Sequence, residues 1–155
     1  MEPFGRSLEK RDRLENRIGY ALQRTQHSLR LRMDAALKEL GVTTPQYAAM
    51  SALKEEPGLS NAQLARRSFV TPQTMNQILM KLEALGLTER WEHPEHGRVL
   101  QAYLTKEGEQ LQEECHRRVA SIEDLMVSRL SEDECRTLLE TLRRCIQALR
   151  WNDSG

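Results

Sequence analysis

The sequence predicts a mainly α-helical fold with one small β-hairpin. Charged residues make up 30% of the 155 residues and aromatic residues only 5%, which is typical of a chain built from amphipathic helices. Ser or Thr stands at the start of most of the predicted helices, where its side chain can cap the first turn. Two short segments with strand-like composition flank a turn-rich stretch, and this pattern predicts the hairpin.

Two helices are predicted in the first third of the chain. Apolar residues recur at helical spacing from Leu8 to Leu40, and Gly41 ends this long helix as a C′ glycine. Thr44-Pro45 opens the next helix, because Thr is a good N-cap and Pro is favoured at the first helical position. This helix runs to about Glu56, where Pro57-Gly58 breaks it.

Two shorter helices follow and form a helix-turn-helix. Ser60 and Gln63 have the spacing of a capping box at the start of a helix that ends near Ser68. Thr71-Pro72 repeats the signal of a cap followed by proline. The helix that it opens carries apolar residues at helical spacing and stops at Gly86.

The remaining segments complete a winged helix-turn-helix with long flanking helices. Residues 88–91 and 99–104 form the hairpin, Thr105 caps a second long helix, and a capping box at Ser131 opens the last one. The chain is therefore one domain, 1–155, with a DNA-binding region at 42–105 and a helical dimerisation region at 8–40 and 106–151. The apolar faces of the outer helices are too extensive for this one small DNA-binding region to cover. A second copy of the chain is expected to cover them, which predicts a homodimer.

The outward face of the helix after Thr71 favours DNA recognition. Its apolar side must turn inward, which leaves a face rich in amides and poor in acids. Asn and Gln can pair with adenine through two hydrogen bonds, and Thr can touch a thymine methyl or a phosphate. An ordinary solvated face would usually carry Glu and Lys. The residues expected to read bases are Gln73, Thr74, Asn76 and Gln77.

Other residues of the same region are expected to bind the DNA backbone or the minor groove. Ser60 and Lys81 are expected to bind phosphates, and Asn61 and Thr71 lie beside them at helix starts. Arg98 at the hairpin tip can enter a narrow minor groove, although it could equally be a solvated charge. Residues 60–105 hold five basic and four acidic side chains, so we expect a modest dependence of DNA binding on salt.

Several motifs resemble those of MarR-type transcriptional regulators. They are Thr44-Pro45-Gln46-Tyr47, residues 59–65, residues 81–90 and the run Leu104-Thr105-Lys106-Glu107-Gly108. The resemblance covers about residues 12–150 and implies a homodimer that binds a pseudo-palindromic operator in double-stranded DNA, usually as a repressor. It also implies release by a small aromatic or anionic effector, or by cysteine oxidation in some members.

The resemblance has one departure, which lies in the hairpin. The family often has an acid two residues before the wing arginine, and His96 stands there instead. The orientation of the wing is therefore in question. Since the unperturbed pKa of histidine lies near neutrality, His96 is a hypothetical pH-sensitive element of operator binding.

The resemblance also implies that the first two long helices line an effector pocket. The candidate residues are Tyr20 and His27, which share a face of the first helix, and Tyr47 and Met50 on the second. Ordinary packing with satisfied polar tips is the competing interpretation for each of them.

Cysteine and histidine chemistry gives weaker alternatives. Cys115 and Cys145 lie on apolar stripes and are expected at the dimer interface, while Cys135 is a candidate redox site near a helix start. His93, Glu95 and His96 could ligate zinc, but a plain wing loop is the preferred interpretation, with no metal and no cofactor.

Two other function classes are considered. An enzyme is not expected, because the chain has no phosphate loop and no catalytic triad or carboxylate pair in a recognisable frame. A helical adaptor that binds only proteins would fit the outer helices but not the amide-rich face or the wing. The lack of an apolar stretch of about 18 residues predicts no membrane span, and the odd, widely spaced cysteines favour a reducing, cytoplasmic location.

Overall fold

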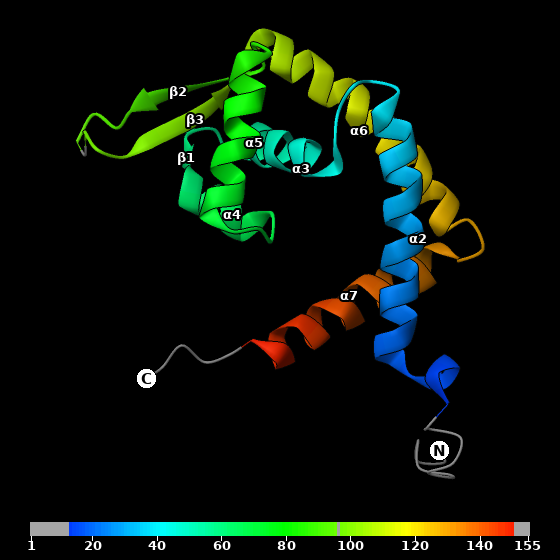
Figure 1. Ribbon diagram of the computed structural model, residues 1–155. Coiled ribbons are helices and arrows are strands. Elements are labelled where there is room, and N and C mark those ends of the chain that lie inside the picture. The colour runs from blue at the N-terminus through cyan, green and yellow to red at the C-terminus, as the bar shows by residue number, and fades with distance from the viewer. Residues whose placement is uncertain (1–12, 96, 151–155) are drawn as a thin grey trace.

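The computed structural model describes residues 13–95 and 97–150 (Figure 1). This part of the chain contains a short 3-10 helix, six α-helices and a three-stranded sheet, as the sequence predicts apart from one strand. None of its helices has the length and apolar character needed to cross a membrane. In chain order the elements are η1 (Leu14–Asn16), α2 (Ile18–Lys38), α3 (Thr44–Glu55), β1 (Leu59–Ser60), α4 (Asn61–Arg67), α5 (Pro72–Ala84), β2 (Thr88–Glu92), β3 (Leu100–Leu104), α6 (Lys106–Met126) and α7 (Glu132–Leu149).

The long helices and the reading head, which is the helix-turn-helix and wing of residues 59–104, occupy different parts of the molecule. Helices α2 and α6 contact each other, and the hairpin projects away on the far side of α5 (Figure 1). Helix α3 contacts both α5 and α6, so it connects the reading head to the long helices. None of the residues of α7 is buried.

The first helix is shorter than predicted. Arg17 is extended, with φ −93° and ψ 128°, so the regular α-helix begins at Ile18 and only the 3-10 turn of η1 precedes it in the described part. The predicted residues 8–12 lie outside the described residues. Leu14 and Ile18 are exposed in the single chain, so no packing within it forces these residues into one continuous helix.

Most helix caps are confirmed, and one is wrong by a residue. Ser60 and Ser131 form the predicted capping boxes, and Thr105 accepts a hydrogen bond from the first turn of α6. The cap of α3 is Thr43, not Thr44. Its Oγ1 accepts from the Gln46 backbone N–H at 3.2 Å, and the Gln46 side chain accepts from the Thr43 N–H at 3.0 Å. This reciprocal pair requires the spacing of three residues that Thr43 alone provides.

The sheet contains a strand that the sequence did not predict. Strands β2 and β3 form the expected antiparallel hairpin, with Thr88 opposite Leu104. The two-residue strand β1 pairs with the other edge of β3, where Leu59 lies opposite Ala102. The strand order is β1-β3-β2, so the start of α4 is joined to the wing through the sheet.

The core lies between the end of α2, helices α3, α4 and α5, the sheet, and α6 as far as Val119. Its largest fully buried side chains are Leu37, Met50, Leu53, Leu64, Met75, Leu79, Leu82 and Cys115. Gly108 in the first turn of α6 contacts the end of the reading head closely, since a Cβ added there would lie 2.0 Å from the Leu87 carbonyl oxygen. The start of α6 therefore rests directly on the backbone between α5 and β2.

Candidate nucleic-acid interface

Helix α5 presents a polar outer face at the predicted reading position. Its inward residues Met75, Leu79 and Leu82 are fully buried, as their spacing predicts. The Thr71 hydroxyl oxygen caps the helix by accepting from the Thr74 N–H at 3.1 Å, and it donates to the Thr74 hydroxyl at 3.0 Å. The first turn is therefore held in place before any ligand binds. The exposed outward residues are Gln73, Thr74, Gln77 and Lys81.

Asn76 differs from its neighbours because the wing engages it. The half-buried Asn76 accepts a hydrogen bond at its side-chain oxygen from Arg90 Nη1 at 2.8 Å. Arg90 also donates to the Glu83 carboxylate, so one guanidinium on β2 links two residues of α5. The Asn76 amide NH₂ contacts Met80 Sδ at 3.7 Å. This arrangement fixes the wing against the reading helix, and the direct contact of Asn76 with bases stays a prediction.

Ser60 and Asn61 set the start of α4 against the start of α5. The Asn61 side-chain NH₂ donates to the Pro72 carbonyl at 2.8 Å. Its side-chain oxygen is buried and has no hydrogen-bond partner among the described residues. Ser60 Oγ accepts from the Gln63 N–H at 3.3 Å, which leaves its hydroxyl hydrogen able to donate outward. Of the two, Ser60 is the better placed to meet a phosphate.

The wing carries Arg98 near its tip. The His93 N–H donates to the Val99 carbonyl at 2.8 Å, which extends the hairpin pairing beyond the two strands. Arg98 follows the tip and is exposed. His96 lies outside the described residues, so its effect on the wing and its proposed pH sensitivity stay predictions.

Some basic residues of the reading head form ion pairs with carboxylates, and a small set does not. Arg67 is paired with Glu56, and Arg90 with Glu83. Within the described ranges, no carboxylate pairs with the remaining basic residues of the reading head, which are Arg66, Lys81 and Arg98. These three are therefore the charges available to DNA.

A groove of about 650 Å³ runs between the long helix α2, the start of α3 and the reading helix α5. Arg30, Asp34 and Lys38 line it from α2, and Val42, Pro45 and Ile78 give it apolar surface. The outward residues Thr74, Gln77 and Lys81 of the reading helix line it as well. A molecule in this groove would therefore touch both the dimerisation region and the face that is expected to read DNA.

Asp34 is the acid of this groove and is held by two neighbours. It accepts hydrogen bonds from the Thr44 hydroxyl and from Arg30 Nε, the latter at 3.0 Å. The Thr44 hydrogen bond, followed by that of Arg30, lowers the pKa of Asp34. Lys38 and Lys81 line the groove without a carboxylate partner in the described chain, so the lining carries excess positive charge.

The four residues suggested for an effector pocket are not brought together. Met50 is fully buried in the core, and His27 is exposed on α2. Tyr47 is almost completely buried, and its hydroxyl lies 3.3 Å from His116 Nδ1 on α6. Tyr20 is half-buried beneath the Arg24 guanidinium, 5.9 Å from the ring centroid. The groove described above is lined by the same two helices but by none of these four residues.

The cysteines occupy three different environments. Cys115 is buried in the core of its own chain, so the prediction that places it at the dimer interface is wrong, and burial raises the pKa of its thiol. Cys145 is exposed and Cys135 is half-buried. Reactive cysteines have electropositive surroundings, whereas three acids share the first turn of α7 with Cys135. Among the described residues, no cluster of His, Cys, Asp and Glu suits a metal ion.

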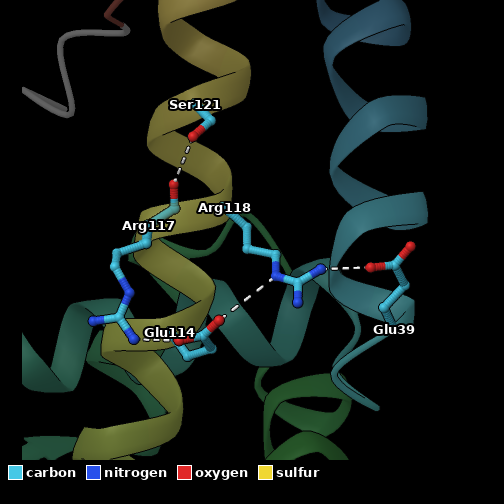
Figure 2. A network of polar contacts seen from close by, with 5 residues as sticks. All are labelled: Glu39, Glu114, Arg117, Arg118 and Ser121. Atoms are coloured by element: carbon cyan, nitrogen blue, oxygen red, sulfur yellow. Dashed lines mark hydrogen bonds and ion pairs between the residues drawn. The ribbon is translucent and has the colours of Figure 1, made fainter.

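Polar contacts tie the middle of α6 to the end of α2 and to α3. Arg118 bridges Glu114 on its own helix and Glu39 at the end of α2, while Arg117 pairs with Glu114 (Figure 2). On the neighbouring side of α6, Gln112 donates to the Ser51 hydroxyl of α3 at 3.3 Å. Exposed pairs of this kind add little stability. They link α6 to the end of α2 and to α3.

Comparison with known proteins identifies the family. The MarR family profile matches residues 40–99, which span the helix-turn-helix and most of the wing. The chain is also 37% identical, over 127 residues, to the HTH-type transcriptional repressor Rv2887 of Mycobacterium tuberculosis. This alignment covers 82% of the present chain and 91% of the relative. The chain belongs to the MarR family of transcriptional regulators.

Solved structures of the same relative agree with this MarR assignment. The crystal structure of Rv2887 in complex with salicylic acid has 36% sequence identity and a TM-score of 0.69, and the match covers 83% of this chain and 96% of that one. The structure of Rv2887 in complex with DNA has 34% identity and a TM-score of 0.70, with coverages of 83% and 97%. The predicted winged helix-turn-helix fold is therefore confirmed.

Proposed function

We propose that this MarR family protein is a homodimeric repressor that binds a pseudo-palindromic operator and releases it when a small aromatic acid binds. The observation that carries the proposal is the exposed amide face of α5, which is preceded by a preformed cap and flanked by a wing. The two α5 helices of the dimer enter successive major grooves, about 34–36 Å apart. A regulator of this kind acts on the chromosome, so we place it in the cytoplasm.

The contacts divide into base reading and backbone binding. Gln73, Thr74 and Gln77 read base edges from the major groove, where amides recognise adenine and Thr meets the thymine methyl. Asn76 reads with its NH₂ group while Arg90 holds its oxygen. The contacts to the DNA backbone come from residues at helix starts and from one unpaired lysine. Arg98 enters the flanking minor groove. The backbone residues are Ser60, Asn61, Thr71 and Lys81.

An uncovered apolar face supports the homodimer. Helix α7 carries apolar side chains at helical spacing, yet none of its residues is buried in the single chain. The exposed apolar residues of the outer helices include Leu14, Ile18, Leu22, Leu138, Leu139, Ile146 and Leu149. A second copy is the natural cover for them, because large exposed apolar patches mark interaction sites and two-fold dimers are the commonest assembly. Residues 8–40 and 106–151 then form the dimerisation region.

The groove between α2, α3 and α5 is the proposed effector site. A relative binds salicylic acid, which combines an aromatic ring with a carboxylate. The groove offers apolar surface and an excess of cations to such a ligand. A ligand there would contact Thr74, Gln77 and Lys81 directly and would favour a dimer whose reading helices no longer match the operator. Tyr20, His27, Tyr47 and Met50 would take part only if the helices move.

Fluorescence anisotropy with a duplex from the region upstream of the gene tests this function. We expect operator binding that survives competition by unrelated DNA and weakens as salicylate is added. The Lys38→Gln variant removes a groove cation outside the reading face, so it should bind DNA normally but need more salicylate for release. Lys106→Gln, an exposed lysine at the start of α6, is the matched control. No specific binding at low salt would favour a protein-binding adaptor, and equal salicylate responses of the two variants would exclude the groove.

A further inference from the structure

A second hollow lies where the wing meets the helix-turn-helix. It has a volume of about 300 Å³, and its polar lining comes from both sides: Ser60, Gln63 and Arg66 from the helix-turn-helix, and His93 and Gln101 from the hairpin. Among the described residues, no carboxylate lines it. Its lining therefore offers hydroxyl, amide, guanidinium and imidazole groups, which suit an anion.

The cation of this hollow is not used elsewhere in the described part of the molecule. Arg66 has no carboxylate or hydrogen-bond partner there, whereas the next residue, Arg67, is paired with Glu56. Of these two consecutive arginines on α4, Arg67 forms an ion pair with Glu56, and only Arg66 lines the hollow. An unpaired guanidinium beside polar donors is the usual partner of a phosphate.

The two other donors are held in place by contacts of their own. Ser60 Oγ accepts from the Gln63 N–H, so its hydroxyl hydrogen is available to an acceptor outside the helix. His93 Nδ1 accepts from the Glu95 N–H at 3.0 Å, which fixes the orientation of the imidazole ring beside the hollow. The pairing of β1 with β3 fixes the distance between these two sides of the hollow.

We propose that this hollow is a clamp for one phosphodiester group of the operator, and this inference rests on the proposed function. If α5 lies in the major groove and Arg98 in the adjacent minor groove, one strand of the backbone must pass between them. The first helix of a helix-turn-helix crosses that backbone. The clamp, made of Ser60, Arg66 and His93, holds the phosphate at this crossing and sets the wing relative to the reading helix.

The salt dependence of DNA binding by the full-length protein tests the clamp. Each phosphate contact adds about 0.9 to the slope of log affinity against log salt. Arg66→Gln removes one such contact from each half-site of the dimer, so the slope should fall by about 1.8, and raising salt from about 50 to 200 mM should weaken the variant about 12-fold less than the wild type. Arg67→Gln removes the same charge from the neighbouring position and should keep the wild-type slope. Operator and unrelated duplexes of equal length should lose affinity equally in Arg66→Gln, because a phosphate contact carries no sequence information.

A chemical readout locates the phosphate. In duplexes that carry a neutral methylphosphonate at one position at a time, one position in each half-site should weaken the wild type and have no further effect on Arg66→Gln. Three results would overturn the clamp while DNA binding itself stands. They are equal salt slopes for Arg66→Gln and Arg67→Gln, a loss of affinity in Arg66→Gln that is confined to the operator, and methylphosphonate penalties that add to the Arg66→Gln loss at every position. Absence of operator binding by the wild type would overturn the proposed function together with the clamp.

Discussion

Replacing Gly108 by alanine tests how tightly the long helix α6 is seated on the reading head. The added Cβ would lie 2.0 Å from the Leu87 carbonyl oxygen, 2.9 Å from its carbonyl carbon and 3.2 Å from Leu104 Cδ2. The nearest neighbour is backbone and cannot rotate away. The oxygen and the new methyl must therefore part from 2.0 Å to an ordinary contact of about 3.4 Å, and this requires α6 to move.

The expected loss follows from two opposing effects. Overpacking of a close contact costs about 1–3 kcal/mol. Alanine is the better helix former by about 1 kcal/mol at most, and by less in a first turn. The free energy of unfolding should therefore fall by about 1–2 kcal/mol. At a urea dependence near 2 kcal/mol per molar, the unfolding midpoint would fall by about 0.5–1 M.

Urea unfolding of Gly108→Ala and Gly19→Ala, at equal protein concentration, measures this effect. Gly19 lies in the first turn of α2, and a Cβ added there meets no atom within 4 Å, so alanine should leave its midpoint unchanged or raise it slightly. Equal concentration matters because dimerisation contributes to stability. A Gly108→Ala midpoint equal to or above that of the wild type would refute the close seating of α6 on Leu87.

Three further predictions concern single side chains. Gln77→Ala should lose about 1–3 kcal/mol of discrimination at one base position, measured by binding to single-base operator variants. The control Gln110→Ala on α6 should keep full selectivity, and unchanged selectivity in Gln77→Ala would count against its role. Phe69 is exposed and has a positive φ of 56°, a backbone conformation that glycine adopts at lower cost than phenylalanine. Phe69→Gly should therefore raise the free energy of unfolding by about 0.5–1 kcal/mol. A lower urea midpoint would show instead that the ring contributes to folding. Burial raises the pKa of Tyr47, so its contribution to stability is present below the unfolded pKa near 10 and is lost as pH rises through the folded pKa. Tyr47→Phe should therefore reduce the loss of stability above about pH 10, and an alkaline unfolding profile identical to that of the wild type would contradict this.

Local signals predicted most of the helices and their starts. The capping boxes at Ser60 and Ser131 depend on residues three apart, and the buried face of α5 depends on helical spacing, so both can be read along the chain. The error at the start of α3 arose from the adjacent residues Thr43 and Thr44. The position of Gln46 selects Thr43, and that signal was present in the sequence.

Tertiary contacts explain what the sequence did not predict. The two residues of β1 are too few for an alternating pattern, and their pairing with β3 joins segments about forty residues apart. The Arg90 bridge to Asn76 and Glu83 and the groove lined by α2, α3 and α5 exist only in the folded chain. A charge count gave five basic and four acidic residues in the region 60–105, but it did not distinguish the paired Arg67 from the unpaired Arg66.

Footprinting upstream of the gene and its neighbours tests the central claim most directly. If two α5 helices read one operator, hydroxyl-radical cleavage should reveal two protected half-sites about 10–10.5 base pairs apart, centre to centre, and related by two-fold symmetry. The flanking minor grooves, where Arg98 is expected, should be protected as well. A single protected half-site, or protection without a fixed spacing, would contradict recognition by a symmetric pair of reading helices.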